Sequence, residues 1–95
     1  MYKIKTTHQF EKDLERCKKR GYTMEKLRTV IQLLERDGTL PLQYRPHILR
    51  GDRIGQWECH IQPDWLLVWN QFEDELELLL LNTGTHSDLF GKTRR

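Results

Sequence analysis

The chain has 95 residues, of which 37% are hydrophobic and 32% charged, and its formal net charge is +2. This length supports one hydrophobic core, so we expect a single domain over residues 1–95. No apolar run is long enough to cross a membrane, and the two cysteines, at positions 17 and 59, lack the CxxC spacing of a zinc or redox site. With no secretory leader visible, we expect a reducing, cytoplasmic location.

Positive charge is concentrated near the start of the chain. Residues 1–20 contain seven lysines and arginines against three acidic residues, whereas acids gather at 73–77. A basic face is typical of a protein with a phosphate-rich partner, although an ordinary solvated surface would have the same composition.

The N-terminal third predicts a strand and then a helix. Residues 1–5, "MYKIK", alternate apolar and basic side chains, the period of a half-buried strand. Thr6, followed three residues later by Gln9, forms a capping-box pattern, so we expect a helix to begin there. Phe10, Leu14 and Cys17 lie on one stripe of that helix.

A second helix is predicted from a cap at Thr23 to the pair Asp37 and Gly38. Its apolar residues recur at helical spacing, at positions 27, 30, 31 and 34. The short link predicts an antiparallel helical hairpin whose apolar stripes face a common sheet. Prolines 41 and 46 favour an extended connection in "TLPLQYRP".

The remaining chain has the period of strands. "GQWECHIQ" at 55–62 places Trp57, Cys59 and Ile61 on one side and His60 on the other. A turn at 63–64, the apolar run at 65–70, an acidic turn and the strand 76–82 follow. The predicted fold is therefore α+β, with two N-terminal helices on one face of a twisted, mainly antiparallel sheet of four to five strands.

Histidines 47, 60 and 86 all fall in or beside this sheet. Strand ends lie close together in a sheet, so these rings and Asp64 can converge on one site. Imidazoles with a carboxylate suit acid–base catalysis near neutral pH. Two alternatives remain: a zinc site, for which the close ligand spacing is missing, and hydrogen-bonded surface histidines.

Three motifs carry a resemblance to a known family: "PHILRG" at 46–51, "ECHIQPDWLLVW" at 58–69 and "TGTHSDLFG" at 83–91. In this order, after two helices, they resemble the RelE superfamily of bacterial toxins, and the YafQ branch in particular. The resemblance implies a ribosome-dependent endoribonuclease that cuts A-site codons of mRNA. In such an enzyme the ribose 2′-hydroxyl attacks the adjacent phosphate, and the reaction needs no metal or cofactor. The resemblance also implies a cognate antitoxin that neutralises the toxin.

The resemblance also implies site residues. His86 is expected to be the general acid, Asp64 with His60 to act on the base side, and His47 to hold the phosphate. The expected catalytic set is His47, His60, Asp64, Asn82 and His86. The expected substrate contacts are Phe90, Trp65, Arg50 and Arg53.

Asn82 departs from the family pattern, which usually has an arginine there. Asparagine keeps a hydrogen-bond donor but loses the charge that would stabilise the phosphorane. Either Arg50, Arg53 or an arginine of the C-terminal tail substitutes, or cleavage by this protein is weakened.

The implied partners are the ribosome with its 16S rRNA, mRNA, a cognate antitoxin and, through the antitoxin, operator DNA; no membrane is implied. Basic residues expected to contact rRNA phosphates are Lys3, Lys5, Lys12, Arg16, Lys18, Lys19, Arg20 and the C-terminal tail. Two other functions remain open: a relative that binds the ribosome or antitoxin without efficient cleavage, and a regulatory subunit that reaches DNA only through its antitoxin.

Overall fold

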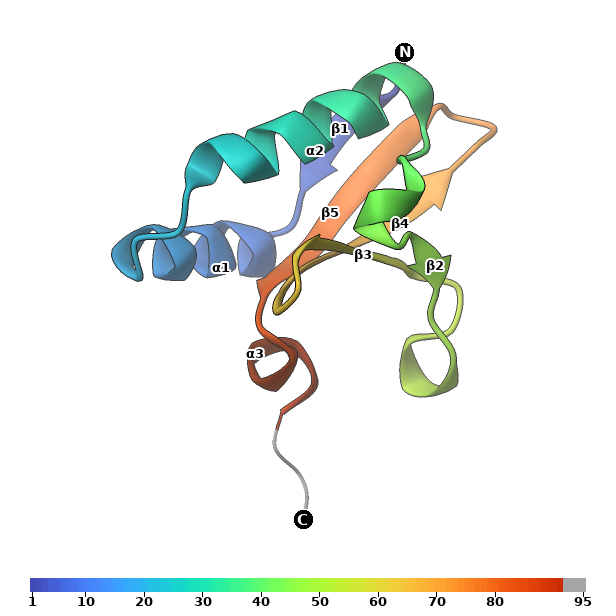
Figure 1. The fold of residues 1–95 in the computed structure, drawn as a ribbon. Helices are drawn as coiled ribbons and strands as arrows, with labels where there is room; N and C mark the ends of the chain where they lie inside the picture. The colour runs from blue at the N-terminus through green and yellow to red at the C-terminus, as the bar shows by residue number, and fades with distance from the viewer. Residues whose placement is uncertain (92–95) are drawn as a thin grey trace.

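Two long helices cover one face of a five-stranded sheet in the computed structural model, which describes residues 1–91 (Figure 1). In chain order the elements are β1 (Lys3–Thr6), α1 (His8–Lys19), α2 (Met24–Asp37), η1 (Leu42–Tyr44), β2 (His47–Ile48), η2 (Gly51–Arg53), β3 (Trp57–Gln62), β4 (Trp65–Phe72), β5 (Glu77–Gly84) and α3 (His86–Phe90), where η marks a 3-10 helix. The strand order is β1-β5-β4-β3-β2, with β1 parallel to β5 and every other pair antiparallel. The predicted α+β class is confirmed. None of the helices in residues 1–91 is long and apolar enough to span a bilayer.

Helix α1 starts one residue later than predicted. Thr7, not Thr6, caps it, because the Thr7 hydroxyl accepts a hydrogen bond from the Phe10 backbone N–H at 3.0 Å. Thr6 belongs to β1, and its hydroxyl donates to Glu11 at 2.6 Å. Both threonines are suitable caps, and the pairing of β1 with β5 up to Thr6 decides between them.

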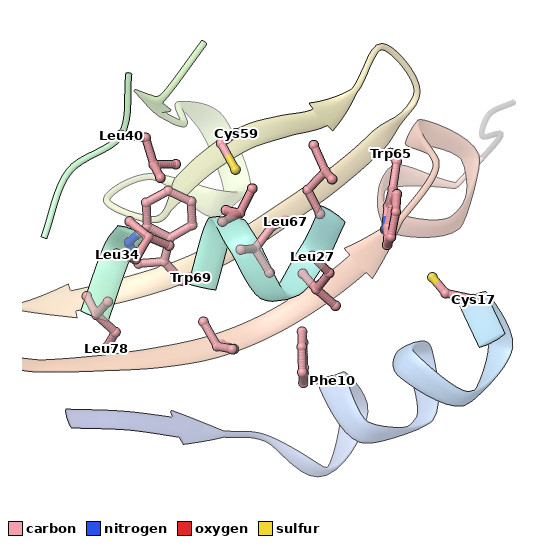
Figure 2. Packing of buried hydrophobic residues seen from close by; sticks show 13 residues of the cluster. Phe10, Cys17, Leu27, Leu34, Leu40, Cys59, Trp65, Leu67, Trp69 and Leu78 are labelled. Atoms are coloured by element: carbon pink, nitrogen blue, oxygen red, sulfur yellow. The ribbon is translucent and has the colours of Figure 1, made fainter. Parts of the chain in front are cut away.

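The core lies between the helices and the sheet. Leu27, Val30 and Leu34 of α2 are buried against β3, β4 and β5 (Figure 2). Cys17 and Cys59 are fully buried, as predicted, and burial raises the pKa of Cys59 to about 12. Both thiols therefore act as small apolar core residues rather than as nucleophiles.

The connection between the helices and the sheet was predicted to be extended. It contains instead the 3-10 turn η1. Pro41 precedes this turn, where a missing N–H costs nothing. The turn ends at Arg45 in the left-handed conformation, with φ of 51°. The chain then enters β2, where His47 faces Glu58 and Ile48 faces Trp57 of β3.

The polar segment after the last strand forms the short helix α3. In α3 the Thr85 hydroxyl accepts from the Asp88 N–H at 3.1 Å, and the Asp88 carboxylate accepts from the Thr85 N–H at 2.9 Å. This capping box holds the short helix at the end of β5, near η2 (Figure 1).

Candidate active site

The three histidines form a row at one end of the sheet. The ring centroids of His47 and His60 are 6.3 Å apart, and those of His60 and His86 are 6.1 Å apart. Phe90 extends the row, with its ring centroid 6.0 Å from that of His86. The row exists because β2 pairs with β3, and α3 begins directly after β5. The predicted convergence of these residues is confirmed.

Asp64 holds His86. Its Oδ1 accepts from the His86 backbone N–H at 3.1 Å and lies 3.2 Å from His86 Nδ1. A carboxylate only accepts, so Nδ1 carries the proton and donates to it, which leaves Nε2 for a substrate. These hydrogen bonds, that of the backbone N–H first, lower the pKa of Asp64 below its ordinary value. A carboxylate with a lowered pKa is a poor base, and this geometry suits Asp64 to orienting His86.

His60 keeps one ring nitrogen for proton transfer. Its Nδ1 lies 3.3 Å from the carbonyl oxygen of Pro63, which can only accept a hydrogen bond. Nδ1 therefore donates, and within residues 1–91 no side chain or backbone group bonds to Nε2. The unprotonated Nε2 has the lone pair that a general base requires.

His47 is held by two acceptors. Its Nδ1 lies 2.9 Å from the Arg45 carbonyl oxygen, and its Nε2 lies 3.1 Å from Oε1 of Glu58. Only a ring protonated on both nitrogens donates to both, so this geometry suits a fixed positive charge. Glu58 is 4% exposed and was missed by the sequence analysis. The sequence does contain a signal for it, because the alternation of side chains along β3 puts Glu58 on the same side as His60.

Arg53 supplies the site with a guanidinium. Its Nη2 donates to Oδ1 of Asn82, and its Cζ lies 5.5 Å from the centroid of the Phe90 ring. The other terminal nitrogen, Nη1, is buried and has no hydrogen-bond partner in residues 1–91. A buried donor without a partner is costly, so an acceptor that reached this nitrogen would be stabilising. Arg50, by contrast, is exposed and makes no such contact.

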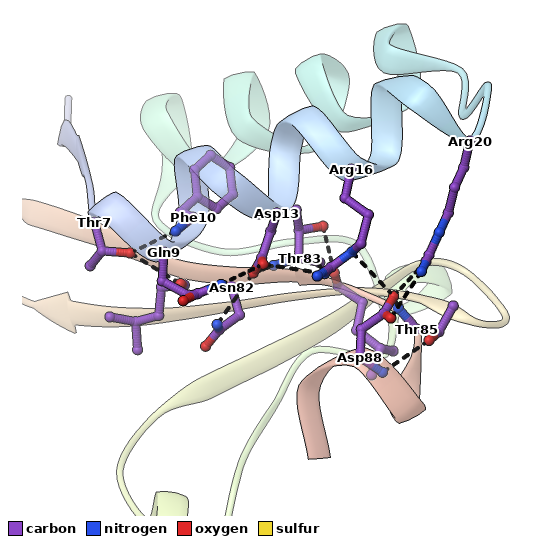
Figure 3. A network of polar contacts seen from close by, with 12 residues as sticks. Thr7, Gln9, Phe10, Asp13, Arg16, Arg20, Asn82, Thr83, Thr85 and Asp88 are labelled. Carbon is purple, nitrogen blue, oxygen red and sulfur yellow. Dashed lines mark hydrogen bonds and ion pairs between the residues drawn. The ribbon is translucent and has the colours of Figure 1, made fainter. Parts of the chain in front are cut away.

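The buried carboxylate of Asp13 accepts a hydrogen bond from the side chain of Asn82 (Figure 3). Asp13 of α1 is 2% exposed, and its Oδ2 accepts from the Asn82 side chain at 3.3 Å and from the Thr83 N–H at 3.1 Å. Its Oδ1 accepts from Gln9 at 2.9 Å and pairs with Arg16 at 3.2 Å. The amide of Asn82 therefore connects the Asp13 carboxylate to the Arg53 guanidinium.

Trp65 is a core residue, which corrects its expected role as a substrate contact. It is 2% exposed and lies among the core side chains (Figure 2). Its Nε1 donates to the Thr83 hydroxyl at 2.9 Å, and its ring packs edge-on against Tyr22. A side chain in this position cannot stack on a substrate base. Phe90, at 41% exposure, can.

Two of the expected rRNA contacts are used inside the protein. Arg20 pairs with Asp88 at 2.6 Å, and Arg16 lies 3.7 Å from the same carboxylate while donating to the Thr83 carbonyl at 3.2 Å. These contacts, the hydrogen bond from Arg20 first, hold the pKa of Asp88 well below its ordinary range. Arg16 and Arg20 thus tie α1 to α3 rather than project toward a partner.

The expected lysines are at the surface. Lys5 pairs with Glu77 at 2.7 Å and Lys18 lies 3.8 Å from Glu15. Lys3, Lys12 and Lys19 are exposed. The basic tail lies outside the described residues.

Residues 1–91 contain no group of three or more His, Cys, Asp or Glu side chains that could hold a metal ion. Imidazoles beside a guanidinium are groups that can transfer protons and stabilise negative charge.

Comparison with known proteins places this chain among bacterial toxins of type II toxin–antitoxin systems. The model of the YafQ toxin family of such systems matches residues 2–91. The mRNA interferase toxin YafQ of Escherichia coli K12 is 39% identical over 90 residues, which cover 93% of this chain and 95% of that protein. This chain belongs to the YafQ toxin family.

Solved structures agree with this assignment. The E. coli DinJ–YafQ complex contains a chain that is 35% identical, with a TM-score of 0.86 and coverage of 96% of this chain and 100% of that one. A metal-bound toxin from Helicobacter pylori is 37% identical, with a TM-score of 0.86 and coverage of 95% and 100%.

Proposed function

We propose that this protein is an endoribonuclease toxin that cuts mRNA in the ribosomal A site and is neutralised by a cognate antitoxin. The observation that carries the proposal is the ordered row of His47, His60, His86 and Phe90 with Arg53 beside it. The relatives named mRNA interferase toxins and the DinJ–YafQ complex support the activity and the kind of partner.

The reaction begins with proton removal. His60 Nε2 takes the proton of the ribose 2′-hydroxyl, and the 2′-oxygen forms a bond to the adjacent phosphorus. His47 lies next to His60, and its Nδ1 and Nε2 already donate to Arg45 and Glu58. It therefore contributes positive charge near the phosphate rather than a second base.

The bond from phosphorus to the 5′-oxygen then breaks. His86 enters this step protonated on both ring nitrogens: Nδ1 donates to Asp64, and the Nε2 proton passes to the departing oxygen, which leaves a neutral ring. The products are a 2′,3′-cyclic phosphate and a 5′-hydroxyl, so protons and bonds balance without a metal or cofactor.

Arg53 and Phe90 complete the substrate contacts. The guanidinium of Arg53 places positive charge near the phosphate oxygens, which gain negative charge in the phosphorane. Phe90 stacks on a base that has left the codon helix. In this proposal Arg53 supplies the charge that Asn82 lacks.

Docking on the ribosome is assigned to the exposed lysines of β1 and α1. Lysine contacts with rRNA phosphates fix orientation without reading sequence, and their affinity falls as salt rises. Operator DNA would be reached only through the antitoxin, and the site of action is the cytoplasm, where ribosomes are.

Primer extension on programmed ribosomes tests the proposal. The purified protein should produce one cut within the A-site codon, and His86→Ala should abolish it. Absence of a cut with both the parent and Asn82→Arg would contradict nuclease activity.

A binding module without efficient cleavage is the second candidate, and Asn82 is the observation that favours it. In that case the protein would co-sediment with ribosomes in a salt-dependent way and leave the message intact, whereas Asn82→Arg would restore cleavage.

A further inference from the structure

A hollow of about 240 Å³ opens beside His60, between η1 and the end of β3. Gln43, Arg45, His60, Ile61, Gln62 and Pro63 line it. Antiparallel pairing of β2 with β3 ends at His47 and Glu58, so the chain before β2 diverges from the last residues of β3 and leaves this space. The volume is smaller than the 300–1,000 Å³ or so of a site for a drug-sized ligand, and it suits a single ring system.

The polar lining has the donors and acceptors that base edges require. Gln43 and Gln62 each offer an amide donor and a carbonyl acceptor, and Arg45 offers a guanidinium. Within residues 1–91 none of these three side chains makes a hydrogen bond to another group. Pro63 and Ile61 add apolar surface, against which a flat ring can lie.

The walls of the hollow also position the catalytic rings. The Pro63 carbonyl accepts from His60 Nδ1, and the Arg45 carbonyl accepts from His47 Nδ1. Arg45 has a positive φ of 51°, a conformation that is uncommon for a non-glycine residue and that occurs often at functional sites. A ring seated in the hollow would therefore lie beside His60, the proposed general base.

We propose that this hollow is a nucleobase subsite, which binds the base of a nucleotide next to the scissile phosphate and gives the cut its sequence preference. Gln43 and Gln62 read the hydrogen-bonding edge of that base, and Arg45 contacts its phosphate or its ring face. This inference rests on the proposed mRNA cleavage, because only an RNA held for cutting presents an unpaired base at His60.

The test compares cleavage rates on ribosomes programmed with messages that differ at one nucleotide on either side of the cut. The parent should favour one base at one of these positions by about tenfold. Gln62→Ala and Gln43→Ala should reduce that ratio severalfold. Gln62→Glu replaces the amide donor by an acceptor, so it should change which base is favoured.

Two further variants separate base recognition from folding. Arg45→Gly removes the guanidinium, but glycine suits the left-handed backbone that directs the Arg45 carbonyl at His47. This variant should therefore lower the preference without loss of stability. Gln32→Ala changes an exposed glutamine of α2 outside the hollow and should leave the preference unchanged.

A parent that cuts with the same base ratios as Gln62→Ala, Gln43→Ala and Gln62→Glu would overturn the subsite while leaving the nuclease in place. A parent that cuts all bases equally would do the same. A parent that does not cut at all would overturn the nuclease proposal and the subsite with it.

Discussion

Arg53 is the residue that, in the proposed reaction, supplies a guanidinium beside the histidine row. Its guanidinium bonds to Asn82 and lies over Phe90, so it occupies the space beside the histidine row where a phosphorane would need a donor. We predict that Arg53→Ala lowers the cleavage rate about a hundredfold, the usual effect of losing one such donor. Single-turnover primer extension measures this rate.

Arg50→Ala is the matched control, because Arg50 is exposed and close in sequence. It should change the rate less than tenfold. In the Arg53→Ala background, Asn82→Arg should recover part of the lost rate. Equal effects of Arg50→Ala and Arg53→Ala would contradict the role of Arg53.

Asp64 acts through His86. Its pKa is lowered by the hydrogen bonds that it accepts from His86, so it stays ionised throughout the neutral range and holds the Nδ1–H of His86 against its own carboxylate. We predict that Asp64→Asn reduces cleavage at least tenfold without changing the free energy of unfolding by more than about 0.5 kcal/mol, since the residue is exposed. Rate measurements from pH 5 to pH 9 and urea unfolding check both parts; a rate equal to that of the parent would exclude the orienting role.

At the level of elements, the Asp88 carboxylate ties α3 to α1. Asp88 closes the capping box of α3 and pairs with Arg20 and Arg16 of α1, which lower its pKa. A carboxyl whose pKa is lowered by folding stabilises the native state above its unfolded pKa of about 3.9, and this contribution is lost as the pH falls through that value toward the lower folded pKa.

We therefore predict that the parent loses stability between pH 5 and pH 3 more steeply than Asp88→Asn does. The advantage of the parent over Asp88→Asn in free energy of unfolding should be about 1 kcal/mol larger at pH 7 than at pH 3. This figure allows for the partial exposure of Arg20. Urea unfolding at several pH values measures the difference. Asp74→Asn, in the exposed turn after β4, should leave the pH dependence of the parent unchanged.

The elements with a clear period were predictable, and those that depend on distant pairing were less so. Leu27, Val30 and Leu34 identified α2, and the alternation around Cys59 identified β3. The cap of α1 was assigned to Thr6 rather than Thr7, since only the pairing of β1 with β5 separates them.

The candidate site was predictable in its residues but not in their partners. The motifs gave His47, His60, His86 and Phe90. They could not show that Asp64 bonds to His86 rather than to His60, because strand register and the direction of α3 decide this. Asp13 shares the stripe of Phe10 and Cys17, and a carboxylate within an apolar stripe was a signal that it is buried and bonded.

For the whole molecule, folding divides the N-terminal positive charge into two parts. Arg16 and Arg20 are bonded to Asp88, whereas Lys12 and Lys19 of α1 remain exposed. We predict that ribosome affinity falls as salt rises, and that Lys12→Ala and Lys19→Ala each reduce the slope of log affinity against log salt by about 1. Co-sedimentation at several salt concentrations measures the slope.

Arg36→Ala is a suitable control, because Arg36 pairs with Asp37 at the far end of α2. It should leave the slope unchanged. A parent whose ribosome binding does not depend on salt would contradict docking through the lysines.

Because Asp88 both caps α3 and pairs with the end of α1, the position of His86, the acid of the proposed reaction, depends on a contact outside the reacting groups. Cells forced to survive an uncontrolled copy of this gene should accumulate changes at position 88 as well as at the histidines. Such survivors would carry a toxin that still folds and keeps every imidazole, but no longer holds His86 where the leaving oxygen needs it.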